Sequence, residues 1–129
     1  MAYSFSSLEE LGENYGFRKV RREMGVTAFG ANVIVMPAGF EGFGHYHDTQ
    51  DELYFVHSGR ATFEVDGEER EVGPGTLVHV DATTPRRFSN AGDEDLVVLV
   101  VGGKDGYVEH DGHLVDPEAD LARRQSFGN

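Results

Sequence analysis

The sequence predicts an all-β domain, folded as a barrel or sandwich of short strands. Three observations lead to this prediction. Residues 31–102 form a series of short apolar runs, which Gly, Pro, Asn and Asp interrupt at nearly even spacing. The runs are rich in Val, Phe, Tyr and Ile, which suit a half-buried pleated surface. Asp66-Gly67 stands between two such runs, and this dipeptide favours a two-residue hairpin of type I′.

The apolar runs give the expected strands in chain order. They cover residues 31–36, 53–57, 61–65, 69–72, 77–80, 87–89 and 96–101. Three further turns are expected at residues 37–39, 73–75 and 90–93, because Gly, Pro, Asn and Asp accept the backbone angles that reverse the chain.

Both ends of the chain carry helix signals. Ser7 followed by Glu10 fits a capping box, and Gly12 limits this helix to one or two turns. Asp116-Pro117 fits an N-cap followed by Pro at the first helical position, so a second helix is expected over residues 118–124. The fold class is therefore all-β with short helical termini.

The length of 129 residues fits one domain, residues 1–129. Its barrel core is expected over about 31–102. The N-terminal arm, 1–26, and the C-terminal tail, 103–129, are expected to pack on the barrel or on a partner subunit. The arm is long enough to reach a neighbour, and a small open sheet structure leaves strand edges that need covering, so a C2 homodimer is expected.

Composition excludes several classes of function. The net charge of −12 argues against nucleic acid, which requires a basic face. The longest wholly apolar run, Leu96 to Val101, is far too short to span a membrane as a helix. The first ten residues lack the pattern of a signal peptide, so a cytoplasmic location is expected. The chain has no Cys and no Gly-x-Ser-x-Gly, which argues against thiol or serine nucleophiles.

Three side chains have the spacing of a metal site. His45 and His47 are two residues apart, so in a strand both point to one face. Glu52 begins the next apolar run after a polar turn, and a hairpin of that length lays it beside the two imidazoles. Two imidazoles and one carboxylate form a facial ligand set that suits Fe(II), Mn(II), Zn(II) or Ni(II).

Two glycines extend this spacing into a longer motif. Gly39, His45, His47, Glu52 and Gly59 reproduce the pattern Gly, five residues, His-x-His, four residues, Glu, six residues, Gly. This pattern resembles the first motif of the cupin superfamily, and in particular of its small single-domain, conserved-barrel members. The resemblance covers roughly residues 33–101. It implies a double-stranded β-helix, or jelly-roll barrel, and a divalent metal ion on the two His and the Glu.

The second cupin motif is altered. Gly75 and Asn90 fit its spacing, but Asp81 and Thr83 replace the usual Pro and Gly, and Arg86 stands where the fourth metal ligand is usual. Arginine has no free lone pair and stays protonated, so it cannot bind a cation.

Three arrangements of Arg86 follow. In the first, the metal stays on the three other ligands, and Arg86 binds a substrate carboxylate or phosphate beside it. In the second, no metal binds, and Arg86 pairs with Glu52 inside the barrel. In the third, His79 completes the site, although strand alternation points it away from the interior.

Strand parity identifies further residues of the interior. Tyr54 shares parity with Glu52, and Asn90 shares parity with Arg86, so Arg86, Tyr54 and Asn90 are the predicted substrate-binding residues. A buried Tyr54 whose hydroxyl is satisfied by the protein is an equal alternative. His57, with the opposite parity, is expected on the surface, as are His110 and His113.

The function expected from this ligand set is a metal-dependent enzyme of the oxygenase or isomerase type. Open positions on a two-His, one-carboxylate ion suit dioxygenase-like O₂ activation or Lewis-acid chemistry. The partner is a small molecule, and Arg86 favours an anionic one. The alternative is a non-catalytic binding or sensing module without metal chemistry, which the altered second motif favours. The sequence does not identify the substrate, the reaction or the metal.

Overall fold

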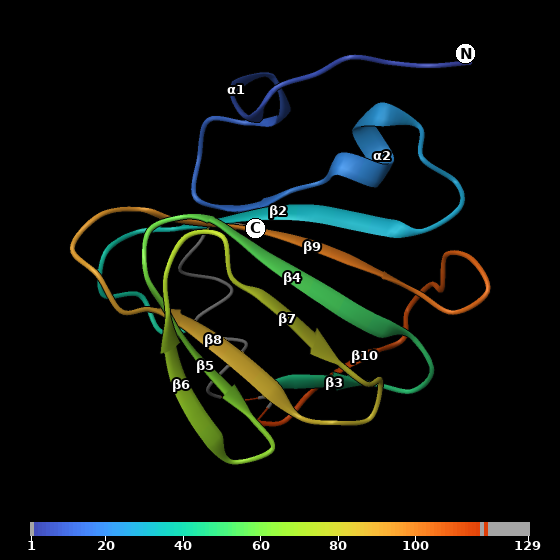
Figure 1. Cartoon of the computed structure of the whole chain (residues 1–129). Helices are drawn as coiled ribbons and strands as arrows, with labels where there is room; N and C mark the ends of the chain where they lie inside the picture. Colours follow the sequence, from blue (N-terminus) through green and yellow to red (C-terminus); the bar gives the residue numbers. More distant parts are fainter. Residues whose placement is uncertain (1, 117, 119–129) are drawn as a thin grey trace.

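The computed structural model describes residues 2–116 and 118 of the chain. In this part, two five-stranded antiparallel sheets pack face to face (Figure 1). The first sheet has the order β1-β2-β9-β4-β7 and the second the order β10-β3-β8-β5-β6. The all-β jelly-roll prediction is therefore confirmed.

The strands of the first sheet include the longest of the chain. They are β1 (Gly16–Arg18), β2 (Gly30–Met36), β9 (Leu96–Gly103), β4 (Asp51–Ser58) and β7 (Leu77–Val80). The second sheet holds β10 (Gly112–Leu114), β3 (His45–His47), β8 (Arg86–Asn90), β5 (Ala61–Val65) and β6 (Glu68–Val72). All seven predicted strands are present, with ends that differ by two residues at most. Strands β1, β3 and β10 come in addition.

Side chains that alternate inward along these strands make up the core. Val56 and Val98 in the first sheet face Phe63 and Phe88 in the second, and all four are buried. The rings of Phe63 and Phe88 are stacked with centroids 5.2 Å apart. Burying each of these side chains stabilises the fold by about 1.5–3 kcal/mol, which explains why alternating apolar residues determine the two sheets.

The hairpin between β5 and β6 follows the predicted turn. Val65 pairs with Glu68, and the two residues between them, Asp66 and Gly67, have φ angles of 50° and 84°. Positive φ at both central residues is the requirement of a type I′ turn, and Gly meets it without strain. The register of this hairpin is thereby fixed locally.

Short helices precede the barrel. In α1 (Leu8–Leu11), the Ser7 hydroxyl accepts a hydrogen bond from the Glu10 backbone N–H at 3.2 Å, which confirms the predicted cap. A second helix, α2 (Val20–Met24), was not predicted; it packs against β2 and ends at Gly25, whose φ is 73°. Apart from residue 118, the helix predicted over residues 118–124 lies outside the described residues. No helix of the described chain is long and apolar enough to cross a membrane.

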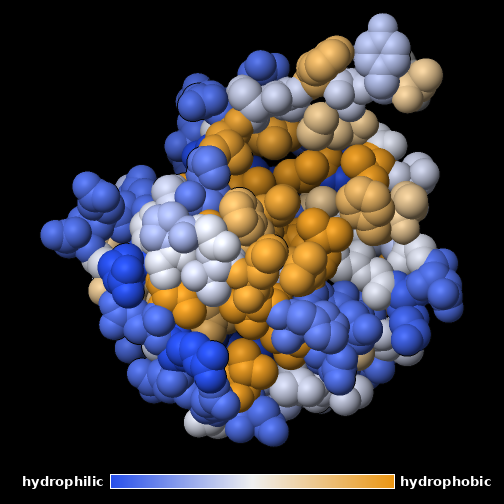
Figure 2. Space-filling view, viewed as in Figure 1, coloured by the Kyte–Doolittle hydropathy of each residue, from blue (hydrophilic) through white to orange (hydrophobic). Residues whose placement is uncertain are grey.

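The outer face of the first sheet carries exposed apolar side chains. Leu53 is 44% exposed and Leu77 is 62% exposed. Phe55 pairs with Leu77 in the ladder and points to the same face as Leu53. Figure 2 shows apolar side chains gathered in the middle of the visible face, where β4 and β7 lie in Figure 1.

Candidate metal centre

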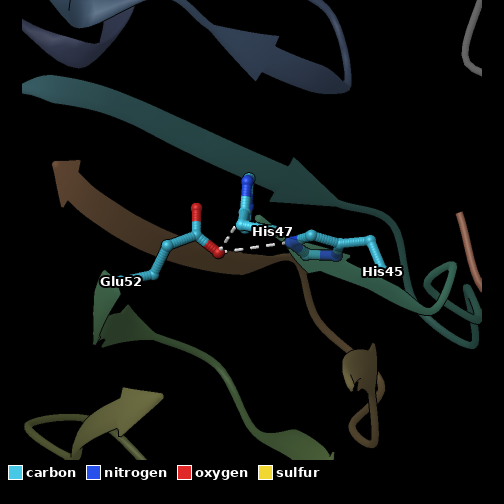
Figure 3. Close-up of side chains that lie close together, drawn as sticks. All are labelled: His45, His47 and Glu52. Carbon is cyan, nitrogen blue, oxygen red and sulfur yellow. Dashed lines mark hydrogen bonds and ion pairs between the residues drawn. The ribbon is translucent and has the colours of Figure 1, made fainter. Parts of the chain in front are cut away.

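One strand of the second sheet and one strand of the first bring three side chains to one point (Figure 3). His45 and His47 share one face of β3, and Glu52 lies near the start of β4. The Nε2 atoms of both histidines lie 3.2 Å from Oε1 of Glu52. The imidazole rings stand almost perpendicular, with centroids 5.1 Å apart. The convergence expected from the sequence is therefore present.

The separations between these atoms fit a metal ion. Two ligand atoms that hold one ion at right angles, with bonds of about 2.1 Å, lie about 3.0 Å apart. The observed 3.2 Å from each imidazole nitrogen to the carboxylate oxygen is close to this separation. His47 Nε2 is buried and makes no hydrogen bond within the described residues. A metal ion held between the three side chains would give this nitrogen a partner.

The Glu52 carboxylate is ionised in this surrounding. Burial disfavours its charged form, but the hydrogen bond with His45 and the electrostatic attraction of both imidazoles outweigh burial and hold the pKa of Glu52 well below its usual range. The Tyr54 hydroxyl donates a hydrogen bond of 2.7 Å to Oε1 of Glu52. Burial, and then the negative charge of Glu52, raise the pKa of Tyr54, so its hydroxyl stays a donor.

Arg86 lies beside Glu52 and has a fully buried side chain. Its Nη1 donates to the carbonyl oxygens of Ala82 and Thr84, both at 2.9 Å, and its Nη2 donates to that of Asp81 at 3.4 Å. Its Nε lies 3.5 Å from Oε1 of Glu52. The guanidinium group thus holds the turn that precedes β8.

This position resembles the second of the three arrangements, with Arg86 next to Glu52 inside the barrel. It differs in one respect, because both imidazoles keep their places at the same carboxylate oxygen. His79 does not complete the site. Its side chain is 60% exposed on the outer face and lies 3.6 Å from Asp81, as strand parity predicts.

A cavity of about 430 Å³ opens in front of the three side chains. Its walls include His45, His47, Glu52 and Tyr54. Arg86 and Asn90, two of the three predicted substrate-binding residues, do not line it. The Asn90 amide nitrogen donates to the carbonyl oxygens of Met36 and Glu94, and its oxygen accepts from the Gly92 N–H. Asn90 therefore holds the turn after β8.

The structure adds a residue that the sequence did not indicate. Asp111, buried just before β10, accepts hydrogen bonds from the backbone N–H groups of Thr49 and Gln50 at 3.0 and 2.9 Å. Its Oδ2 lies 3.6 Å from Nδ1 of His47. Burial raises the pKa of Asp111. The hydrogen bonds from Gln50 and Thr49 lower it by a larger amount, so the net shift of the pKa is downward.

Gln50 also contacts the ring of His47. The Gln50 side-chain nitrogen lies 3.1 Å from His47 Nδ1. With Asp111 on the same ring nitrogen, two polar groups fix the orientation of the imidazole from behind, which leaves Nε2 directed at Glu52. Nothing local in the sequence distinguishes Asp111 from the many other acidic residues. The pairing of Gly112 with His47 across the sheet brings it here.

Comparisons with known proteins agree with the fold. The family model described as "Cupin domain" matches residues 32–102. An uncharacterised protein of Methanocaldococcus jannaschii is 31% identical over 65 residues, which are 50% of this chain and 52% of that protein. The chain spans about half the length of the curated relatives that it matches.

Two solved structures are similar over most of the chain. A cupin protein from Bacteroides fragilis has a TM-score of 0.70 and 24% identity, over 84% of this chain and 90% of that one. At this identity the likeness shows the fold alone. The DMSP lyase DddQ from Ruegeria pomeroyi has a TM-score of 0.62 and 32% identity, over 70% of this chain and 45% of that one.

Proposed function

This chain belongs to the cupin superfamily, and we propose that it holds one divalent metal ion through His45, His47 and Glu52 and acts on a small molecule in the barrel cavity. The observation that carries the proposal is the separation of 3.2 Å from each imidazole Nε2 to the same carboxylate oxygen. Imidazole and carboxylate ligands suit Fe, Mn, Zn or Ni, and the identity of the ion stays open.

The proposed activity is that of a metal-dependent enzyme. A divalent ion with free positions supplies Lewis-acid chemistry or a place for O₂. The chain's own residues prepare the site: Glu52 is charged, Tyr54 holds its carboxylate, and Gln50 with Asp111 holds the His47 ring. The likeness to a lyase supports an enzymatic role, and we propose an oxygenase, isomerase or lyase type of reaction without choosing among them.

Metal analysis of protein purified without a His tag tests this proposal. We expect about one divalent ion per chain, and its loss in a His47→Ala protein that keeps its fold. His57→Ala is the matched control, since His57 lies on β4 with an exposed side chain. Absence of metal in the parent protein, after incubation with Zn, Ni, Mn and Fe(II) in turn, would refute the proposal.

One observation favours a second candidate function. Arg86 places a fixed positive charge 3.5 Å from Oε1 of Glu52, so the carboxylate already has a cationic neighbour without a metal ion. A binding or sensing module that works without metal is consistent with this arrangement. Such a protein should bind its ligand equally well with and without metal, and release it unchanged.

The assembly that we propose is a homodimer. Leu53 and Leu77 present an exposed apolar face on β4 and β7, and Tyr3 and Phe5 stand 76% and 91% exposed on the N-terminal arm. Single exposed apolar residues are ordinary, but a contiguous face together with an aromatic arm is typical of an interface. The predicted cytoplasmic location stays a prediction.

A further inference from the structure

The walls of the cavity are largely apolar. From the first sheet, Ile34, Met36 and Val100 face inward, and Phe88 faces them from the second. Phe17 and Phe43 stand at the side of His45, with ring centroids 6.4 Å apart, and the ring of Phe43 lies 6.1 Å from that of His45. A molecule that has one end at His45, His47 and Glu52 and extends from there into the cavity therefore contacts hydrocarbon and aromatic surface.

The described walls of the cavity carry no fixed positive charge. Among the described residues that line it there is no Lys or Arg, and Arg86 is turned to backbone carbonyl groups. Two carboxylates, Glu52 and Asp111, line the same cavity. Together they balance the charge of one divalent ion. A ligand with two negative charges would lose its hydration here without gaining a matching cation, which is strongly unfavourable.

One wall residue is a neutral polar group without a partner in the protein. Asn32 lies on β2 between Gly30 and Ile34, and all three line the cavity. It pairs with Val100 in the ladder, and its side chain makes no hydrogen bond within the part of the chain that the structure describes. Gly30 and Gly102 pair in the next row of the ladder, where the Tyr107 ring lies close to Gly30 and the Gln50 side chain close to Gly102.

We infer that the cavity takes a small, largely apolar molecule that carries at most one negative charge and a neutral polar group for Asn32. Its apolar body packs against Phe17, Phe43 and Phe88. Its end at His45 and His47 is a metal-chelating group, a part of the inference that rests on the proposed function. This class excludes sugar phosphates and dicarboxylates, and it replaces the anionic ligand that the position of Arg86 suggested from the sequence.

Binding of three simple probes to the metal-free protein tests whether the cavity wall prefers apolar, uncharged molecules when no metal is bound. The probes are acetamide, benzamide and phenylphosphonate, the last as a dianion in mildly alkaline buffer. Amide chemical shifts in NMR spectra report which residues each probe contacts. We expect benzamide to bind at least about tenfold more tightly than acetamide, because its ring buries more apolar surface. We expect phenylphosphonate to bind more weakly than benzamide.

A single substitution tests the role of Asn32. Asn32→Leu keeps the size of the side chain and removes its hydrogen-bonding atoms. We expect benzamide affinity to fall about three- to tenfold, the effect of one neutral hydrogen bond, while toluene affinity is kept. Asn14→Leu is the matched control, because Asn14 is exposed in a loop and does not line the cavity.

The outcomes separate this inference from the proposed function. Phenylphosphonate as the tightest probe, or acetamide equal to benzamide, would overturn the apolar class even in a protein that binds zinc well. Failure to bind zinc would refute the proposed function and leave the probe series to decide the character of the wall. With zinc bound, benzohydroxamic acid should bind more tightly than benzamide, since only the hydroxamate chelates. Equal affinity of the two would overturn the chelating end.

Discussion

The Nε atom of Arg86 lies 3.5 Å from the Oε1 atom of Glu52, yet only Glu52 lines the cavity. The carboxylate stands between a buried cation on one side and two imidazoles on the other. A positive charge this close to a metal ligand lowers the attraction between the site and a divalent ion, because the local dielectric constant is low. Arg86 therefore stabilises the fold, while its charge would weaken binding of the metal ion that we propose.

Removal of this cation should destabilise the metal-free protein. Arg86→Met leaves three backbone carbonyl groups without their buried donor and Glu52 without its cationic neighbour, so we expect the metal-free protein to lose about 3–5 kcal/mol of unfolding free energy. Urea unfolding measures this loss. Arg87→Met is the control: Arg87 is the next residue on β8, its side chain is about one-third exposed, and it pairs with Glu64. Its effect should stay below about 1 kcal/mol, and an equal loss in both variants would contradict the structural role of Arg86.

Replacement of Arg86 by His tests whether this position reaches the metal. Arg86→His and Arg86→Met both remove the cation, but only His offers a lone pair. We expect zinc affinity, measured by titration calorimetry, to be about tenfold higher in Arg86→His than in Arg86→Met, because a fourth ligand completes a tetrahedral set. Equal zinc affinity in the two variants would mean that the side chain at position 86 does not reach the ion.

The Tyr54 hydroxyl should contribute to the stability of the fold only through its hydrogen bond to Glu52. Tyr54→Phe removes the 2.7 Å hydrogen bond to the carboxylate and keeps the buried ring. We expect a loss of about 1.5–3 kcal/mol in thermal or urea unfolding, the range for a hydrogen bond to a charged group. Tyr46→Phe is the matched control, since the Tyr46 hydroxyl makes no hydrogen bond within the described chain and its ring stacks on His113. A loss as large in Tyr46→Phe would show that the effect is not that of the Glu52 contact.

The sequence predicted those features that local rules determine. The two-residue spacing of His45 and His47 fixes a common face for both, and Asp66-Gly67 fixes its own hairpin. The exposed position of His79 follows from the same alternation. In each case the residues that matter lie within a few positions of one another, so their geometry could be derived before the fold was known.

The remaining features depend on contacts between distant parts of the chain. Arg86 has parity for the interior, but its long side chain ends on carbonyl groups, which every residue type carries. Asn90 likewise serves backbone groups rather than the cavity. Asp111 comes to His47 because β10 adds to β3 over more than sixty residues of chain. No spacing rule identifies such partners from one sequence.

Assembly can be tested through the exposed face of the first sheet. Light scattering at micromolar concentration should give the mass of a dimer. The double variant Leu53→Glu with Leu77→Glu should give a folded monomer, because paired charges on this face oppose its burial. Phe29→Glu, which changes an exposed aromatic residue outside the N-terminal arm and away from β4 and β7, is the control and should stay dimeric. A parent protein of monomer mass would contradict the proposed dimer.

The contact between Asp111 and His47 leads to the last prediction. Asp111→Asn keeps the size of the side chain but removes the charge that accepts from Thr49 and Gln50 and faces Nδ1 of His47. Partners behind a metal-bound imidazole fix its orientation and raise its basicity, and their loss lowers metal affinity by about 10–100-fold. We expect zinc affinity to fall by that factor, with a loss of about 1–3 kcal/mol in metal-free stability.

Asp48→Asn separates this effect from a general loosening of the C-terminal segment. Asp48 also binds that segment, through His113 at 2.8 Å, but its side chain is exposed and forms no ion pair with the neighbouring His47 ring in the described part of the chain. If Asp111 only anchors the segment, both variants should weaken zinc binding alike. If Asp111 orients the metal ligand, zinc affinity should fall in Asp111→Asn and stay within about twofold of the parent in Asp48→Asn, since an exposed ion pair contributes little. The NMR signals of the His47 ring should shift only in Asp111→Asn, because that variant alone changes the group facing Nδ1.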